Sequence, residues 1–316
     1  MKYNHIFGPV PSRRLGLSLG VDLVRHKTCS LDCIYCECGP TTHLTCQRKA
    51  YVAFDSVKAE LAHYFENHPD PDYVTFSGSG EPTLSPDIGR IIDFIKEKKP
   101  NIRVAVLTNA TLLSDPDVRA DLARADMVMP SLDAVTPETF EAINRPEGEI
   151  NIIEVIDGLK TFAESFKGAL WLEVFILPGV NDGKEELETL GAIIRDITPD
   201  RVQLNTLDRP GAVPGLNPAS KKDLDRVAQI IDAPNVEIIA RVKDLASREH
   251  ISDEKMEAMV METIHRRPCT IADLTAALNL EQSKLEILMK RLILEKKVES
   301  LQQDRGTFYQ TIKNPL

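Results

Sequence analysis

The chain has 316 residues, of which 42% are hydrophobic and 27% are charged, and its formal net charge is −10. These fractions are typical of a globular protein and exclude a disordered or fibrous one. The length suits one large domain, or a large domain followed by a small one. No apolar run approaches the roughly 18 to 20 residues that a membrane span needs, so we expect no membrane partner.

The cysteines and the N-terminus indicate a reducing compartment. The stretch "MKYNHIFGPVPSRR" has neither the apolar segment nor the small-residue cleavage site of a signal peptide, so we predict a cytoplasmic protein. Four of the six cysteines lie in residues 27–38, "KTCSLDCIYCEC". Thiols stay reduced in the cytoplasm, so such a cluster favours metal binding or catalysis over disulfides.

The acidic excess is confined to one part of the chain. Residues 254–316 hold 10 Lys and Arg against 9 Asp and Glu, so the excess lies in the first 253 residues. A broad nucleic-acid-binding surface usually has the opposite sign. A nucleic-acid partner is therefore not favoured, although local basic patches occur in acidic proteins.

Short apolar stretches rich in β-branched residues alternate with amphipathic helical segments. The predicted strands are residues 17–24, 72–78, 102–108, 126–133, 170–177 and 201–207, with a further short strand at 236–240. Near-continuous apolar runs of this length are typical of parallel strands that are covered on both faces. Six strand–helix units predict an α/β fold, a partial (β/α)6 TIM-type barrel. A doubly wound open sheet is the alternative.

Two helix starts can be located from their capping signals. Ser85-Pro86-Asp87 and Thr136-Pro137-Glu138 each offer a hydroxyl cap followed by proline at the first helical position. We therefore predict helices that begin at these two proline residues.

The last part of the chain has a different pattern. Three helical segments follow Asp253, and Thr270 and Asp273 have capping-box spacing ahead of the second one. The third helix has apolar residues at helical spacing, which are Leu285, Leu288, Met289 and Leu292. Two strands are then predicted around the turn Asp304-Arg305-Gly306.

This order of three helices and a hairpin predicts a small winged helix-turn-helix domain over residues 251–316, after a first domain of residues 1–250. Such a domain contacts nucleic acid through the second of its paired helices, or serves as a docking or substrate-presenting module. Only Lys284, Lys290 and Arg291 lie on the expected recognition helix, so the second interpretation is favoured.

The cysteines of the cluster have a specific spacing. Cys29, Cys33 and Cys36 form the pattern C-x3-C-x2-C, and Tyr35 precedes the third. A structural zinc site takes four ligands, usually in two separated pairs. Three thiolates in one loop instead suit a [4Fe–4S] cluster that keeps one iron open to a non-protein ligand.

This pattern, with its aromatic residue before the last cysteine, resembles the signature of the radical S-adenosylmethionine (SAM) superfamily, and the resemblance makes Tyr35 a cofactor-binding candidate. The resemblance implies that the open iron binds the amino and carboxylate groups of SAM. It also implies reductive cleavage of SAM to a 5′-deoxyadenosyl radical that abstracts hydrogen from a substrate. The electron would come from a one-electron reductant such as flavodoxin or ferredoxin.

Further motifs follow at the predicted strand ends. In "FSGSGEPTL", Gly78, Gly80, Glu81 and Pro82 match the glycine–glutamate–proline stretch that binds the SAM amino group in this superfamily. The two glycines would let the backbone approach a ligand closely. Ser79 stands where many relatives have a further glycine.

Polar residues also end the next three strands. The resemblance makes Asn109 a cofactor-binding candidate, assigns Ser131 and Asp133 to contacts with the SAM ribose and carboxylate, and leaves Asn181 as a weaker candidate near the adenosine. All these positions fall at carboxyl ends of strands, where barrel enzymes build their active sites. For Ser131 and Asp133 the alternative is an ordinary capped loop.

A narrower resemblance lies upstream. Residues 8–22, "GPVPSRRLGLSLGVD", resemble a subgroup of radical SAM oxidoreductases that is grouped with the wyosine-type tRNA-modifying enzymes. No second cysteine triad precedes the predicted barrel, so the wyosine activity is not carried over. Arg13 and Arg14 either hold a carboxylate or phosphate, which arginine binds bidentately, or pair with loop carboxylates.

The remaining cysteines and the function stay open at this point. Cys38 and Cys46 could ligate an auxiliary cluster, but such a cluster usually takes three or four thiolates and only Cys269, expected to be an ordinary buried thiol, is left. Cys38 is otherwise a candidate redox partner or hydrogen-atom donor, or a spare cysteine. The preferred hypothesis is a radical SAM enzyme acting on a small molecule, a peptide or an RNA base. The alternative is a non-catalytic iron–sulfur sensor that acts through the winged helix. A sensor needs no SAM contacts at the strand ends, so the enzyme is favoured.

Overall fold

The computed structural model describes residues 3–12, 14–239, 253–278, 280–303 and 305–312. Its main feature is an eight-stranded sheet in which the strands lie in chain order. The strands are β1 (Ile6–Ser12), β2 (Gly16–Val21), β5 (Tyr73–Phe76), β6 (Arg103–Thr108), β7 (Met127–Pro130), β8 (Ala169–Phe175), β9 (Arg201–Asn205) and β10 (Val236–Ile238). All neighbours from β2 to β10 pair in parallel, and β1 pairs with β2 in antiparallel orientation.

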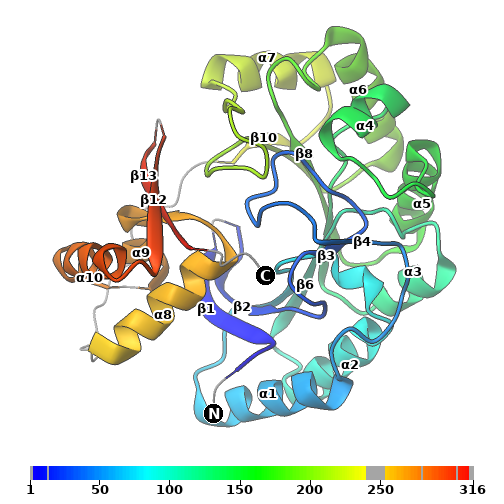
Figure 1. The fold of residues 1–316 in the computed structure, drawn as a ribbon. Helices are drawn as coiled ribbons and strands as arrows, with labels where there is room; N and C mark the ends of the chain where they lie inside the picture. The colour runs from blue at the N-terminus through cyan, green and yellow to red at the C-terminus, as the bar shows by residue number, and fades with distance from the viewer. Residues whose placement is uncertain (1–2, 13, 240–252, 279, 304, 313–316) are drawn as a thin grey trace.

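Helices connect the parallel strands and cover the outer face of the curved sheet (Figure 1). They are α1 (Phe54–Asn67), α2 (Ile88–Lys98), α3 (Pro116–Leu122), α4 (Pro137–Ile143), α5 (Ile152–Ser165), α6 (Lys184–Ile197) and α7 (Lys221–Ile231). The short strands β3 (Thr28–Cys29) and β4 (His43–Leu44) pair in the loop between β2 and α1, and the 3-10 helix η1 (Pro82–Leu84) follows β5. The fold is α/β with a mostly parallel sheet.

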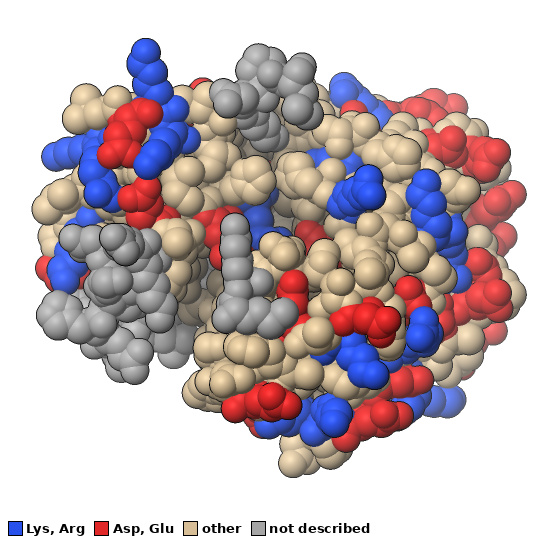
Figure 2. All heavy atoms as spheres, turned by 60° about the horizontal axis from the view of Figure 1, so that its bottom comes forward, with Lys and Arg blue, Asp and Glu red and all other residues tan. Residues whose placement is uncertain are grey.

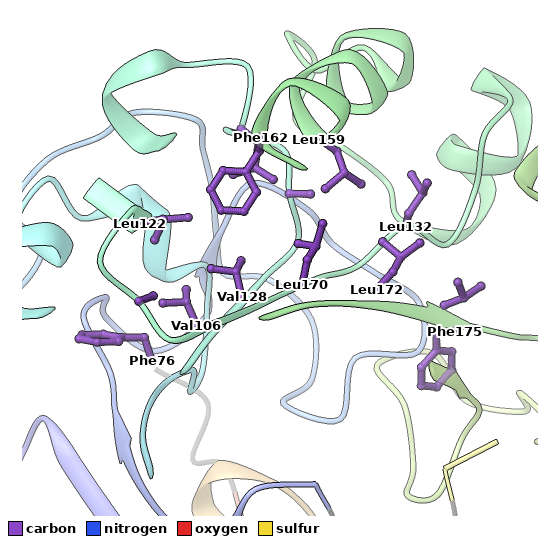
Figure 3. Packing of buried hydrophobic residues seen from close by; sticks show 14 of the residues in the cluster. Phe76, Val106, Leu122, Val128, Leu132, Leu159, Phe162, Leu170, Leu172 and Phe175 are labelled. Atoms are coloured by element: carbon purple, nitrogen blue, oxygen red, sulfur yellow. The ribbon is translucent and has the colours of Figure 1, made fainter. Parts of the chain in front are cut away.

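Alternating side chains of each strand pack on opposite faces of the sheet. Val106, Val128 and Leu172 belong to the large cluster on the outer face, where Leu159 and Phe162 of α5 lie above them (Figure 3). A second cluster on the other face contains Leu15, Tyr73, Ala105, Met127 and Met129. Burial on both faces explains why the strands are almost continuously apolar in sequence.

The predicted strands are confirmed, with ends that differ by a few residues. The strand order runs in one direction without a reversal, so the doubly wound alternative is wrong. Strand β1 was not predicted from the sequence, because Pro9 and Pro11 argue against a strand. The structure puts them at the edge of the sheet, where proline is tolerated because its missing N–H faces no partner strand.

The two predicted helix starts have different outcomes. Thr136 caps α4 as expected, and its side chain accepts a hydrogen bond from the backbone of Thr139. The prediction at Ser85 is wrong, because α2 begins at Ile88. Ser85 ends the preceding 3-10 helix instead, and its N–H donates to the carbonyl of Pro82.

The C-terminal module, residues 253–312, contains the three predicted helices and the hairpin. The elements are α8 (Asp253–Arg266), β11 (Cys269–Thr270), α9 (Ile271–Leu278), α10 (Gln282–Leu294), β12 (Val298–Gln303) and β13 (Gly306–Thr311). Thr270 and Asp273 exchange the two hydrogen bonds expected of a capping box, at 2.9 and 3.1 Å. Cys269 is buried as predicted, whereas Asp304 of the predicted turn lies outside the described residues.

The C-terminal module has a hydrophobic cluster of its own and lies beside β1 (Figure 1). The cluster includes all four predicted residues of α10, which are Leu285, Leu288, Met289 and Leu292. Acidic and basic side chains are interspersed on the face that Figure 2 shows. Among the described helices, none is both long and apolar enough to span a bilayer.

The packing of α6 on α7 can be tested at Gly191. A Cβ atom at this position would lie 2.1 Å from the carbonyl oxygen of Ile231, which is backbone and cannot move aside cheaply. We expect Gly191→Ala to lower the free energy of unfolding by about 1–3 kcal/mol in urea denaturation. Gly148→Ala is the matched control, since Gly148 lies in an exposed turn without a positive φ and no atom lies within 4 Å of a Cβ there, so the change should stay within about 0.5 kcal/mol. Equal stabilities of the two variants would contradict this packing.

Candidate active site at the carboxyl ends of the strands

The three cysteines of the C-x3-C-x2-C motif lie in the loop that follows β2. All three are partly buried, and none forms a disulfide. Each sulfur atom has a nitrogen donor nearby. The distances to Sγ are 3.5 Å from Nδ2 of Asn109 to Cys29, 3.3 Å from Nδ2 of Asn144 to Cys33, and 3.1 Å from Nζ of Lys27 to Cys36. Such donors stabilise a thiolate over a neutral thiol.

The electrostatic environments of the three thiols differ. Burial, and then the carboxylate of Glu81, raise the pKa of Cys29 to about 12. Burial and the carboxylate of Asp133 raise the pKa of Cys33 well above its usual value. A hydrogen bond from the Cys38 thiol and the charge of Lys27 lower the pKa of Cys36 to about 6, against the effect of burial. Without a cation, two of the three thiols would therefore stay neutral at pH 7.

The donor set fits an iron–sulfur cluster better than a single metal ion. Among the described residues, no three His, Cys, Asp or Glu side chains are arranged to hold one metal ion. A cubane [4Fe–4S] cluster does not need three side chains that meet at one ion, since each of its irons takes only one thiolate. Its positive irons would also deprotonate the buried thiols, because a metal-bound thiol loses its proton.

Backbone hydrogen bonds fix the cysteine loop from two sides. The N–H of Ile34 donates to the carbonyl of Ile143 at the end of α4, at 3.0 Å. On the other side, the N–H of Val213 in the loop after β9 donates to the carbonyl of Ile34, also at 3.0 Å. The cysteines are thus held between elements that are far apart in sequence.

The glycine-rich loop after β5 runs along the start of the cysteine loop. Lys27 N–H donates to the Ser79 carbonyl at 2.9 Å, and Glu81 N–H donates to the Thr28 carbonyl at 3.1 Å. Gly80 must be glycine here, because a Cβ atom would lie 2.0 Å from the carbonyl oxygen of Thr28. The two motifs that the sequence analysis linked by resemblance are therefore direct neighbours.

Glu81 is buried, and its carboxylate joins two loops. Oε1 accepts from the backbone and hydroxyl of Thr83, at 3.0 and 2.6 Å, and from the hydroxyl of Thr108 at 2.7 Å. Oε2 accepts from the N–H of Asn109 at 2.7 Å. Most of its hydrogen-bonding capacity is thus used inside the protein, and Pro82 begins the 3-10 helix η1 directly after it.

Four of the predicted cofactor-binding residues line one pocket. These are Tyr35, Asn109, Ser131 and Asp133, together with Asn144. The side chain of Asn109 reaches Ser30 at 2.9 Å as well as Cys29, so it connects this pocket with the cysteine loop. Gly78, Gly80, Glu81, Pro82 and Asn181 are not among the residues that line this pocket.

Asp133 is the centre of a buried network at one side of this pocket. Its carboxylate accepts hydrogen bonds from the Tyr35 hydroxyl at 2.5 Å, from Asn144 Nδ2 at 2.9 Å and from the Phe175 N–H at 2.9 Å. Burial raises the pKa of Asp133 to about 6. The Tyr35 ring stacks on Phe175, with centroids 3.9 Å apart.

Asn181 lies behind this network and has no free donor. Its Nδ2 donates to the carbonyl oxygens of Asp133 and Phe175, at 2.8 and 2.7 Å, and its Oδ1 accepts from the Leu177 N–H at 2.8 Å. In this arrangement Asn181 fixes the backbone around Asp133.

The arginines and spare cysteines also have definite neighbours. Arg14 pairs with Glu173 on β8, a strand residue rather than the predicted loop carboxylate, and Arg13 lies outside the described residues. Cys38 Sγ is 3.6 Å from the Gly78 carbonyl, and Cys46 Sγ is 3.4 Å from Glu147.

Three residues of the site were not predicted from the sequence, which are Lys27, Asn144 and Asp22. Asp22 follows β2 directly and accepts a hydrogen bond from Ser79 of the glycine-rich loop, but the predicted strand 17–24 runs past it, so the strand-end rule that selected Asn109 did not select it. Lys27 lies beside the first cysteine but carries no motif signal. Asn144 ends α4 and reaches the site only through the tertiary fold, which no local pattern indicates.

Comparison with known proteins agrees with this geometry. Residues 23–190, more than half of the chain, match the family model described as the radical SAM superfamily. The chain belongs to the radical SAM superfamily. Among its relatives, a UPF0026 protein of Synechocystis sp. is 38% identical over 208 residues, which cover 65% of this chain and 76% of that protein. A UPF0026 protein of Methanocaldococcus jannaschii is 29% identical over 96% of this chain and 94% of its own length.

One relative differs greatly in length. A protein of Brachyspira hyodysenteriae with the name GTPase Obg is 37% identical over 94% of this chain, but the match covers 44% of that protein. This chain therefore spans less than half of that relative.

Two solved structures share the fold. TYW1 with a lysine–pyruvate adduct has a TM-score of 0.52 at 15% identity and covers 72% of this chain and 76% of its own. Streptococcus suis SuiB bound to SAM has a TM-score of 0.51 at 18% identity and covers 69% and 50%. The eight-stranded sheet is thus consistent with the partial barrel of the radical SAM superfamily.

The role of Glu81 in joining the two loops is testable without any cofactor. In Glu81→Gln the amide nitrogen cannot accept, so at least one buried donor loses its partner. We expect the free energy of unfolding to fall by about 1–3 kcal/mol in urea denaturation of the cofactor-free protein. Glu97→Gln, at an exposed position of α2, should change it by less than about 0.5 kcal/mol. Unchanged stability of Glu81→Gln would show that its hydrogen bonds do not hold the loops.

Proposed function

We propose that this protein is a radical SAM enzyme that cleaves SAM reductively at a [4Fe–4S] cluster and acts on a substrate still to be identified. The observation that carries the proposal is the contact between the cysteine loop and the glycine-rich loop at the carboxyl ends of the strands, in a chain of this superfamily. Cys29, Cys33 and Cys36 would hold the cluster. When bound, the cluster and SAM supply a 5′-deoxyadenosyl radical that takes hydrogen from the substrate.

The chain's own contribution is binding and positioning. Asn109, Asn144 and Lys27 donate toward the three sulfur atoms and would stabilise them as thiolates. Asn109 and Ser131, on the pocket beside the cysteine loop, would contact the ribose and carboxylate of SAM. Asp133 accepts a hydrogen bond from Tyr35, and the two side chains would form the wall of the pocket next to SAM.

The glycine-rich loop supports the amino-group assignment. Gly78 has a φ of +123°, a conformation that L side chains rarely adopt, and its carbonyl faces the cysteine loop at Cys38. Gly80 and Pro82 belong to this loop, and Glu81 connects it to the end of β6 by accepting from the N–H of Asn109. Asn181 would act indirectly, since it donates to the backbone carbonyl of Asp133.

We propose that the C-terminal module is a winged helix-turn-helix domain, with the domain boundary near residue 250. The order of three helices and a hairpin supports this, as does its separate hydrophobic cluster. A docking or substrate-presenting role fits better than nucleic-acid binding. Arg291 of α10 is paired with Glu257 within the module, which leaves fewer free cations for phosphates.

The sensor alternative is not favoured. Members of the radical SAM superfamily are enzymes, and a sensor would need no pocket beside the cysteines. The electron donor would be flavodoxin or ferredoxin. A cytoplasmic location suits six cysteines that are all free.

Cluster binding can be tested by absorbance after anaerobic reconstitution with iron and sulfide. Cys33→Ala should lose most of the broad visible absorbance, because two thiolates hold a cluster poorly. Cys46→Ala is the matched control and should keep it, since Cys46 contacts Glu147 instead. Full absorbance of Cys33→Ala would contradict the ligand assignment.

Catalysis can be tested on the reconstituted protein with SAM and dithionite. We expect 5′-deoxyadenosine, detected by mass spectrometry, in the wild type and in Cys46→Ala but not in Cys33→Ala. A wild-type protein with an intact cluster that neither binds nor cleaves SAM would contradict the proposed function.

A further inference from the structure

A buried carboxylate without a full set of partners lies beside the glycine-rich loop. Asp22, directly after β2, is only 7% exposed. Its Oδ2 accepts from the N–H and the hydroxyl of Ser79, at 3.2 and 2.8 Å. Its Oδ1 is shielded from solvent and has no hydrogen-bond partner within 3.5 Å among the described residues, while the backbone N–H of Val24 also faces this carboxylate.

An unpartnered buried carboxylate oxygen is costly, and its position here is specific. The carboxylate lies against Gly78, because a Cβ atom at Gly78 would be 2.6 Å from Asp22 Cγ. Ser79, which holds Asp22, also accepts the backbone hydrogen bond from Lys27 at the start of the cysteine loop. The free oxygen therefore lies where the glycine-rich and cysteine loops meet.

Asp22 is also held from the C-terminal module. Arg266, the last residue of α8, places Nη1 3.5 Å from Oδ2 of Asp22, on the oxygen that Ser79 already occupies. Its guanidinium stacks on Phe7 of β1, with Cζ 3.8 Å from the ring centroid. The arginine thus fixes the carboxylate through Oδ2 and does not pair with Oδ1.

Other ion pairs hold the module in this place. Arg209, after β9, lies 3.1 Å from Glu37 of the cysteine loop and 3.6 Å from Asp273 of α9. Arg305 of the module pairs with both Asp208 and Asp273. The module is therefore anchored to the first strands and to the loop after β9 at once, which keeps Arg266 against Asp22.

We propose that Asp22 Oδ1 accepts a hydrogen bond from the amino group of SAM, and that Arg266 is a positioning residue that holds Asp22 for this contact. This inference rests on the proposed function, since it assigns a residue to the SAM site. An amino group supplies the N–H donor that Oδ1 lacks, and a charged acceptor makes the hydrogen bond stronger than a neutral one.

Binding of two inactive ligands to the cluster-loaded protein separates this contact from the rest of the site. S-adenosylhomocysteine retains the amino group, whereas 5′-methylthioadenosine keeps the adenosine and sulfur but lacks the amino acid portion. Asp22→Asn should lower the affinity for S-adenosylhomocysteine about tenfold or more and leave the affinity for 5′-methylthioadenosine unchanged. The ratio within one variant is an internal control for general damage to the fold.

Arg266 is tested by a double-mutant cycle with the same ligands. Arg266→Gln alone should lower the affinity for S-adenosylhomocysteine, but the same substitution should cause no further loss of affinity in the Asp22→Asn background. Arg266→Lys, which keeps the positive charge, should lower the affinity less than Arg266→Gln. Arg291→Gln, whose partner Glu257 lies within the module, is the matched control and should leave binding unchanged. Independent, additive losses would overturn the positioning role.

The outcomes distinguish this inference from the function on which it rests. If the wild type binds S-adenosylhomocysteine and Asp22→Asn binds it equally well, or loses both ligands equally, the assignment of Asp22 is overturned and the proposed function stands. If the cluster-loaded wild type binds no S-adenosyl compound, the proposed function falls and the assignment falls with it.

Discussion

The buried carboxylate of Glu81 is the interaction on which the candidate site depends. It joins the loop after β5 to the loop after β6 through Thr83, Thr108 and Asn109. Because Asn109 then reaches Cys29, the same carboxylate indirectly places the first cysteine. The buried carboxylate of Asp133, after β7, likewise connects separate segments, because it accepts hydrogen bonds from Tyr35 of the cysteine loop and from Asn144 at the end of α4. Each carboxylate is costly to bury, and its several hydrogen bonds offset that cost.

Much of the fold was predictable because the strands are buried on both faces. Apolar runs such as residues 103–108 could be recognised without knowledge of their partners, and their spacing indicated the α/β alternation. The hairpin strand β1 was not predictable in the same way, since its two prolines are acceptable only at an edge. The helix start predicted at Ser85 was wrong because the N–H of Ser85 closes a 3-10 turn, which the sequence pattern does not distinguish from the start of an α-helix.

The candidate site was predictable where chemistry follows local spacing. The cysteines and the glycine-rich loop are short motifs, and the structure brings them into contact. Asn144 and Arg266 reach the site across long sequence separations, so no window of sequence contains both partners. For Asn181 the position could be predicted but the role of the side chain could not. Its position at a strand end is as predicted, but its side chain is used by the backbone around Asp133.

The contact between Asp22 and Arg266 has a consequence for how the chain folds. The two residues are separated by 244 positions, and chains emerge from the ribosome from their N-terminus. The strands and the cysteine loop can form while the C-terminal module is still unsynthesised, but Asp22 gains its arginine only after α8 is made. Assembly of this site would therefore be one of the last events in folding. A chain released early would have the cysteine motif and the sheet without the arginine that holds Asp22.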